Sequence, residues 1–137
     1  MDHETPVLES TTISITVHHD WKRLYEEFWR PEAFLRWASG LSDASLQNID
    51  GQWKANGPEG PITIDFTGHN DFGIMDHRVL LSEGQQVYVP LRVIENGEGA
   101  EVMLTLFRQP GMSDAKFTED ANWVRRDLER LKELNEH

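Results

Sequence analysis

The stretch "SDAKFTEDANWVRRDLERLKEL", residues 113–134, constrains the fold more than any other part of the sequence. Its apolar residues recur in alternating steps of four and three, which is the spacing of one face of an α-helix. They are Phe117, Ala121, Val124, Leu128 and Leu131. Ser113 or Asp114 can cap the helix, because their side-chain oxygens accept free N–H groups of a first turn. A helix over residues 114–135 would be about 33 Å long. An apolar face of that length needs a sheet to pack against.

Residues 41–108 are expected to supply most of that sheet. Short apolar runs alternate there with turn residues, in the order "ASLQNID", "QWKANG", "ITIDFTG", "FGIMDHRVLL", "QVYVPLRVIE" and "AEVMLTLFR". An earlier segment, "TTISITVHHD", alternates in the same way and predicts an N-terminal strand. Because the connections are short, neighbouring strands must run antiparallel. The sequence therefore predicts a mainly antiparallel sheet of about six to seven strands.

Two short helices are predicted between the first strand and the rest of the sheet. Asp20 is a plausible N-cap for "WKRLYEEFWR", in which apolar residues have helical spacing. Pro31 would end that helix and suits the first turn of a second one, "PEAFLRWASG". Gly40 is a natural C-terminal stop for the second helix.

Length and composition limit the possible functions. The chain has 137 residues, which fits a single domain over residues 1–137, with residues 1–10 as a candidate disordered tail. A formal net charge of −11 opposes nucleic acids and anionic membrane surfaces as partners. The absence of cysteine excludes disulfides and thiolate metal sites. No apolar run approaches the roughly 20 residues that a membrane span needs, so neither membrane insertion nor a secretory signal is predicted, and the expected location is cytoplasmic.

The order of elements, from strand through two short helices and about six strands to a long helix, resembles a known family over nearly the whole chain. The segments that carry the likeness are "PEAFLRWASGL", "GIMDHRV", "VPLRVIENGEGAEVMLTLFRQPGM" and "DANWVRRDLERLK". The chain is similar to the START-like superfamily, also called SRPBCC, and to a mostly uncharacterised bacterial branch of it. This superfamily includes polyketide cyclases and dehydrases, lipid-transfer START domains and relatives of the birch-pollen allergen. The resemblance implies an α+β helix-grip fold, with the sheet wrapped around the C-terminal helix, and a cavity between them.

The last predicted hairpin indicates which side chains share a face of the sheet. A two-residue turn at Asn96 and Gly97, or a four-residue loop, pairs odd positions with even ones. Both place one apolar set together: Val87, Val89, Leu91, Val93, Val102, Leu104 and Leu106. The two-residue turn would also set Arg92 directly opposite Glu101, as a cross-strand ion pair.

The preceding turn decides where the side chain of His77 lies. A three-residue loop ending at Gly84 would put His77 on the apolar face and leave Asp76 and Arg78 on the other. A loop of two or four residues would instead turn His77 toward Tyr88. We favour the three-residue loop, because it keeps the apolar side chains on one face.

These registers define the candidate site. Asp76 and Arg78 are most simply a solvated pair on the polar face. His77 is most simply a core histidine that makes one hydrogen bond, with contact to a ligand, proton transfer or metal binding as alternatives. The side chains considered for ligand binding are His77, Tyr88, Arg92, Met103 and Trp123. His77 is also the candidate for catalysis, although no catalytic residue is assigned. No cofactor or metal site is predicted, since no HExxH or phosphate-loop motif occurs.

Three functions are compatible with this reading. The first is binding or carrying a small hydrophobic molecule, which the resemblance implies to be lipid-, aromatic- or polyketide-like. The second is an enzyme of the cyclase, aromatase or dehydratase kind, in which His77, or Tyr88 with Arg92, would move protons or steady an enolate. The third is a protein–protein module like the co-chaperone relatives of the fold. A homodimer is compatible with the sequence, because edge strands and tryptophans are available.

Overall fold

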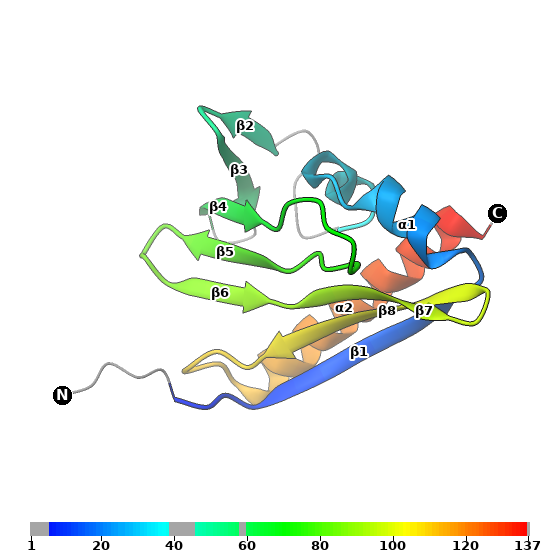
Figure 1. Ribbon diagram of the computed structural model, residues 1–137. Coiled ribbons are helices and arrows are strands. Elements are labelled where there is room, and N and C mark those ends of the chain that lie inside the picture. Colours follow the sequence, from blue (N-terminus) through cyan, green and yellow to red (C-terminus); the bar gives the residue numbers. More distant parts are fainter. Residues whose placement is uncertain (1–5, 39–45, 58–59, 137) are drawn as a thin grey trace.

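The computed structural model describes residues 6–38, 46–57 and 60–136 (Figure 1). It is an α+β structure in the predicted order: one strand, two short helices, the remaining strands and a long C-terminal helix. The elements are β1 (Ser10–Val17), α1 (Trp21–Phe28), the 3₁₀ helix η1 (Pro31–Arg36), β2 (Gln47–Ile49), β3 (Gln52–Gly57), β4 (Gly60–Phe66), β5 (His77–Leu81), β6 (Gln86–Val89), β7 (Leu91–Asn96), β8 (Gly99–Phe107) and α2 (Asp114–Asn135).

The strands form two antiparallel groups that meet at Pro90. One group has the order β1-β8-β7 and the other the order β2-β3-β4-β5-β6. β6 and β7 follow each other with only Pro90 between them, and the Pro90 carbonyl still accepts a hydrogen bond from Thr105 N of β8 at 3.0 Å. Proline has no N–H and interrupts the ladder of hydrogen bonds. β6 and β7 are therefore two halves of one bent strand, and the strand number agrees with the predicted six to seven.

Helix α2 lies behind the sheet and packs against β1 and β8 (Figure 1). Ser113 is its N-cap, and the Ser113 hydroxyl accepts Lys116 N at 3.1 Å. The predicted apolar stripe is the packed face, but it is buried unevenly. Ala121, Leu128 and Leu131 are buried, whereas Phe117 and Val124 are only partly so.

The two N-terminal helices begin where the sequence predicts. The Asp20 carboxylate caps α1 by accepting the N–H groups of Lys22 and Arg23, each at 3.1 Å. The helix at Pro31 is 3₁₀ rather than α-helical, since Arg30 O accepts Ala33 N three residues on. Very short helices often tighten in this way. The predicted stop at Gly40 lies outside the described residues.

The first strand begins within the segment predicted as a candidate disordered tail. Ser10 already belongs to β1, and Glu9 O accepts Arg108 N at 2.8 Å. Residues 9 and 10 are thus part of the sheet. Residues 1–5 lie outside the described residues.

The register of the last hairpin confirms the predicted apolar face and corrects one pair. Leu91 lies opposite Leu104, and Val93 lies opposite Val102. Asn96 pairs with Gly99, so the loop consists of Gly97 and Glu98. The register is that of the four-residue alternative and not that of the turn at Asn96 and Gly97. The predicted Arg92–Glu101 pair is therefore wrong, because the strands are offset by two residues and Ile94 lies opposite Glu101.

The β5–β6 hairpin has the three-residue loop that we favoured. Gly84 has a φ of 89°, and Leu81 N donates to Gln85 O at 2.8 Å across the loop. His77 pairs with Val89, so it shares the apolar face. However, β5 begins only at His77, whereas a strand was predicted from residue 72. The preceding residues leave β4 and reach across to β7, where Met75 N donates to Leu91 O at 2.8 Å.

Candidate ligand-binding face

We call the side of the sheet that faces α2 the inner face and the opposite side the outer face. On the inner face of β1, β7 and β8, most central side chains are fully buried, and Leu91, Val93 and Val102 have 0% exposure. On the inner face of β4, β5 and β6, most side chains are only partly buried. The partly buried ones are Ile62, Phe66, His77, Val79, Leu81, Val87 and Val89. This part of the sheet is therefore less completely covered than the rest.

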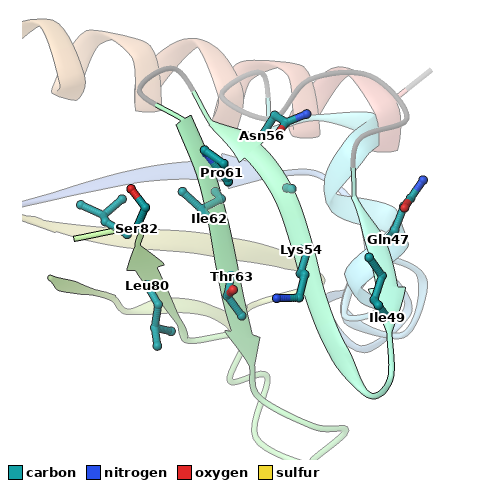
Figure 2. Close-up of a pocket in the computed structure, with 11 residues that line it drawn as sticks. Gln47, Ile49, Lys54, Asn56, Pro61, Ile62, Thr63, Leu80 and Ser82 are labelled. Carbon is teal, nitrogen blue, oxygen red and sulfur yellow. The ribbon is translucent and has the colours of Figure 1, made fainter. Parts of the chain in front are cut away.

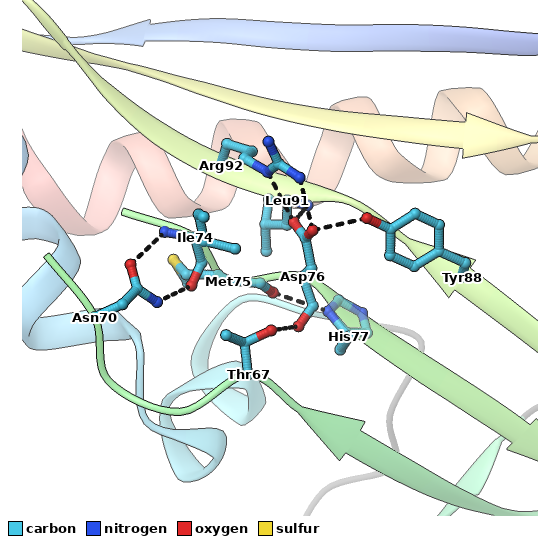
Figure 3. Close-up of polar contacts among 9 residues, drawn as sticks. All are labelled: Thr67, Asn70, Ile74, Met75, Asp76, His77, Tyr88, Leu91 and Arg92. Carbon is cyan, nitrogen blue, oxygen red and sulfur yellow. Dashed lines mark hydrogen bonds and ion pairs between the residues drawn. The ribbon is translucent and has the colours of Figure 1, made fainter. Parts of the chain in front are cut away.

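His77 is the one polar side chain on the inner face of β4, β5 and β6. Its ring lies 5.3 Å from that of Phe34, at an interplanar angle of 79°, and 5.8 Å from that of Phe66. Its Nδ1 is 3.3 Å from Met75 O (Figure 3). A carbonyl oxygen only accepts, so Nδ1 is the donor and Nε2 keeps its lone pair. Burial lowers the pKa of His77 and outweighs the opposing effects of Met75 O and Asp76, so the ring is neutral at pH 7.

Further aromatic rings extend this environment on both sides of His77. Trp37 lies 5.3 Å from Phe34, and Trp53 lies 6.2 Å from Phe66. Neither Phe34 nor Phe66 is among the residues predicted from the sequence to contact a ligand. The alternation in "ITIDFTG" does place Phe66 on the same face as Ile62 and Ile64. No local signal connects Phe34, on η1, to a strand more than forty residues later.

Asp76 organises the outer face. Its carboxylate accepts Tyr88 Oη at 2.8 Å, Leu91 N at 2.9 Å and two nitrogens of Arg92 at 2.8 and 3.1 Å (Figure 3). Burial alone would raise the pKa of Asp76. The hydrogen bonds from Arg92, Leu91 N and Tyr88 together outweigh that effect and hold the pKa below its ordinary value.

The predicted solvated pair of Asp76 and Arg78 is wrong. The Asp76 side chain is only 13% exposed and pairs with Arg92. Arg78 lies over the ring of Tyr88 at 4.4 Å and donates to Gln86 Oε1 at 3.3 Å. The two residues do share a face, as predicted. They bond to different partners because Asp76 precedes β5 and lies beside β7.

The five residues considered for ligand binding do not converge on one place. His77 is on the inner face, whereas Tyr88 and Arg92 hold Asp76 on the outer face. Met103 lies directly opposite Arg92 and is on the outer face as well. Trp123 is partly buried on α2. Tyr88, Arg92 and Met103 therefore do not line a cavity between the sheet and α2, because alternate residues of a strand point to opposite faces.

Two of the hollows among the described residues have no residue of α2 in their lining. The larger, about 520 Å³, lies over β2, β3, β4 and β5 (Figure 2). Its lining includes Lys54, Thr63 and Leu80 of the outer face and also Ile62 and Leu81 of the inner face. The other, about 400 Å³, is near the end of β1, beside His18 and Glu98. A cavity between the sheet and α2 stays a prediction.

The described residues form neither a metal-binding cluster nor a helix that could span a membrane. Over residues 6–38, 46–57 and 60–136, no three histidine or carboxylate side chains are grouped so that they could hold a metal ion. None of the helices described there is long and apolar enough to span a bilayer.

Solved structures resemble this arrangement, although no protein-family model and no curated protein sequence matches the chain. XoxI from Bacillus cereus aligns over 92% of this chain and 94% of its own, with a TM-score of 0.72 at 14% identity. A START superfamily protein from Mycobacterium smegmatis aligns over 92% and 96%, with a TM-score of 0.65 at 8% identity. This chain has a START-like fold. The Aha1 dimer from Colwellia psychrerythraea shares that fold, over 94% and 97% of the two chains, with a TM-score of 0.68 at 12% identity.

The START-like fold explains where His77 lies. The curved sheet turns the inner face of β4, β5 and β6 toward the same interior that η1 and α2 border (Figure 1). Phe34 reaches His77 from η1, and Phe66 reaches it from the neighbouring strand. The fold thus places one neutral imidazole among aromatic rings on a partly covered apolar face.

Proposed function

We propose that this START-like chain binds or carries a small, largely apolar molecule against the inner face of β4, β5 and β6. The observation that carries the proposal is the contrast in burial between the two parts of one apolar face. Leu91 and Val93 are fully buried, whereas Val79, Val87 and Val89 remain partly accessible. Covering such side chains is favourable by about 25 cal/mol for each Å² of apolar area removed from water.

The helix across from this face supports the same proposal. In the first half of α2, Phe117 and Val124 are partly buried on either side of the buried Ala121, whereas Leu128 and Leu131 in the second half are buried. An apolar molecule between the first half of α2 and the sheet would cover both partly exposed surfaces. Binding sites for small molecules are mostly apolar with a few polar groups, which is the composition found here.

The charge on this face bears on the kind of ligand. No side chain on the inner face of β4, β5 or β6 carries a charge at neutral pH, since His77 is neutral there. A buried charge without a partner is costly. The bound part of the ligand is therefore uncharged, and any charged group stays at the protein surface.

A catalytic role is a second candidate, and His77 is the observation that favours it. A neutral imidazole with an unprotonated Nε2 can accept a proton from a bound substrate. The nearest carboxylate in sequence, Asp76, is turned to the outer face and bonded to Arg92, so it does not orient this ring. His77→Phe separates the two functions: a carrier keeps binding its ligand, whereas an enzyme keeps binding but loses turnover.

Native mass spectrometry of protein purified from cells tests the binding function. The expected spectrum contains a complex that releases a small apolar molecule on denaturation. Val79→Trp would fill the inner face and should abolish the complex. Leu80→Trp is the matched control, because Leu80 is the next residue of β5, lies on the outer face and is 37% exposed. An empty wild-type spectrum, together with no uptake of added apolar compounds, would overturn the proposal.

A further inference from the structure

His77 narrows the chemical class of the ligand. We propose that the ligand carries a hydroxyl or phenol group that donates a hydrogen bond to Nε2 of His77. This inference rests on the proposed function, because it places the ligand on the inner face of β4, β5 and β6. It goes further by naming the polar group that the ligand presents there.

The first argument is the composition of the face. The inward side chains of β4 are Ile62, Ile64 and Phe66, and those of β6 are Val87 and Val89. On β5, His77 is followed inward by Val79 and Leu81. His77 is thus the single inward side chain on these three strands that can hydrogen-bond a ligand. Its position decides where a polar group of the ligand goes, since a polar group buried without a partner is costly.

The second argument is the tautomer of the ring. Met75 is buried, and its N–H donates to Leu91 O at 2.8 Å, which anchors the residue that carries this carbonyl. Nδ1 of His77 donates to Met75 O, so the proton of the neutral ring is on Nδ1. Within the described part of the chain, no hydrogen bond to His77 Nε2 is formed. Nε2 therefore presents a bare acceptor, which pairs with a donor and not with a carbonyl or a carboxylate.

The third argument concerns the neighbouring rings. Phe34 approaches His77 edge-on at 79°, and Phe66 lies at a tilt of 37°. Aromatic rings prefer these offset or edge-to-face contacts. A flat aromatic ring bearing the hydroxyl would extend the same cluster, so phenols fit this environment best among hydroxylated apolar molecules.

Three naphthalenes of nearly equal size test the inference: 2-naphthol, which donates; 2-methoxynaphthalene, which only accepts; and 2-methylnaphthalene, which does neither. Affinities for the full chain are measured by calorimetry at pH 7.5. We expect 2-naphthol to bind about 5- to 10-fold more tightly than the other two, as one net hydrogen bond provides. In His77→Phe the preference should vanish while 2-methylnaphthalene still binds. His69→Phe is the control, because His69 is 44% exposed and contacts Glu26, Tyr25 and Trp29 instead.

The outcomes separate this inference from the proposed function. If none of the three compounds binds, the proposed function fails. If all three bind equally to the wild type, or if His77→Phe keeps the preference for 2-naphthol, binding stands and the hydroxyl inference is overturned.

Nitrogen NMR of the wild type is a second test that needs no variant. The ¹⁵N signal of His77 Nε2 should move when 2-naphthol is added and stay in place with 2-methylnaphthalene; an unmoved signal with both would overturn the inference.

Discussion

Asp76 and Arg92 meet at two points, with Arg92 Nε 3.1 Å from Oδ1 and Nη2 2.8 Å from Oδ2 of the carboxylate. The same carboxylate accepts the N–H of Leu91, the residue that follows the interruption at Pro90. Tyr88, on the other side of Pro90, donates to it as well. Asp76 thus connects β6 and β7 at the bend where the proline removes a ladder hydrogen bond.

Asp76→Asn should destabilise the fold by about 2 to 3 kcal/mol. The amide has almost the same shape, but it loses the charge and one acceptor, and it leaves Arg92 and Leu91 N without full partners. Chemical denaturation gives the free energy of unfolding. Asp65→Asn is the matched control. Asp65 lies one strand away on the same face, is exposed, and should change stability by less than about 0.5 kcal/mol. Equal effects of the two substitutions would contradict a special role for Asp76.

The same contacts predict how acid affects stability. The pKa of Asp76 is lowered in the folded chain from an ordinary value of 3.8. As the pH falls below that value, the unfolded chain takes up a proton that the folded chain resists, so stability decreases. The advantage of the wild type over Asp76→Asn should be full above about pH 5 and shrink as the pH falls through 3.8. Denaturation of both proteins from pH 6 to pH 2.5 gives the difference between their free energies of unfolding. The other carboxylates are present in both proteins, so their effect cancels in this difference. A constant difference would show that Asp76 is not held ionised by its partners.

Gly73 is expected to tolerate no side chain. It has a φ of 70°, and a Cβ there would lie 2.1 Å from Val93 O, a backbone atom of β7. Gly73→Ala should therefore cost at least about 3 kcal/mol, or prevent folding. Gly84 is the control: its φ is 89°, but a Cβ would meet nothing within 4 Å. Gly84→Ala should cost only about 1 to 2 kcal/mol, the strain of a left-handed alanine. Similar losses for both variants would contradict the close approach at Gly73.

The inner face could be predicted from the sequence because it depends on alternation and loop length. The apolar residues of β7 and β8 place Leu91 on the same face as Leu104 under any even loop, and the three-residue loop ending at Gly84 was preferred because it keeps the apolar side chains of β5 on that face. Both are local properties of the chain. The face and the position of His77 on it follow from them without knowledge of the rest of the fold.

The partners of Asp76 could not be predicted in the same way. The pattern "FGIMDHRVLL" reads as one strand, so Asp76 was paired with its neighbour Arg78. In the structure the chain before His77 leaves the side of β4 and bridges to β7, where Ile74 lies opposite Arg92. That change of partner depends on Gly73 fitting against Val93, a contact between segments twenty residues apart. The alternation of apolar residues in this segment is the same whether β4 or β7 lies beside it, so the sequence pattern does not reveal the change.

The stability of the wild type should also depend on pH through His77. Burial lowers the pKa of its imidazole from an ordinary value of 6.5. Below pH 6.5 the unfolded chain therefore binds a proton that the folded chain excludes, and stability falls as the pH decreases toward the folded pKa. The loss is at most about 1.4 kcal/mol for each pH unit. His77→Phe removes this group, so its free energy of unfolding should change less between pH 7 and pH 5 than that of the wild type. His69→Gln serves as the control and should keep the His77 contribution, because His69 lies on the α1 side with Glu26. If wild type and His77→Phe lose stability in parallel over this range, the imidazole titrates as freely in the fold as in water, and it would not be the neutral acceptor on the inner face.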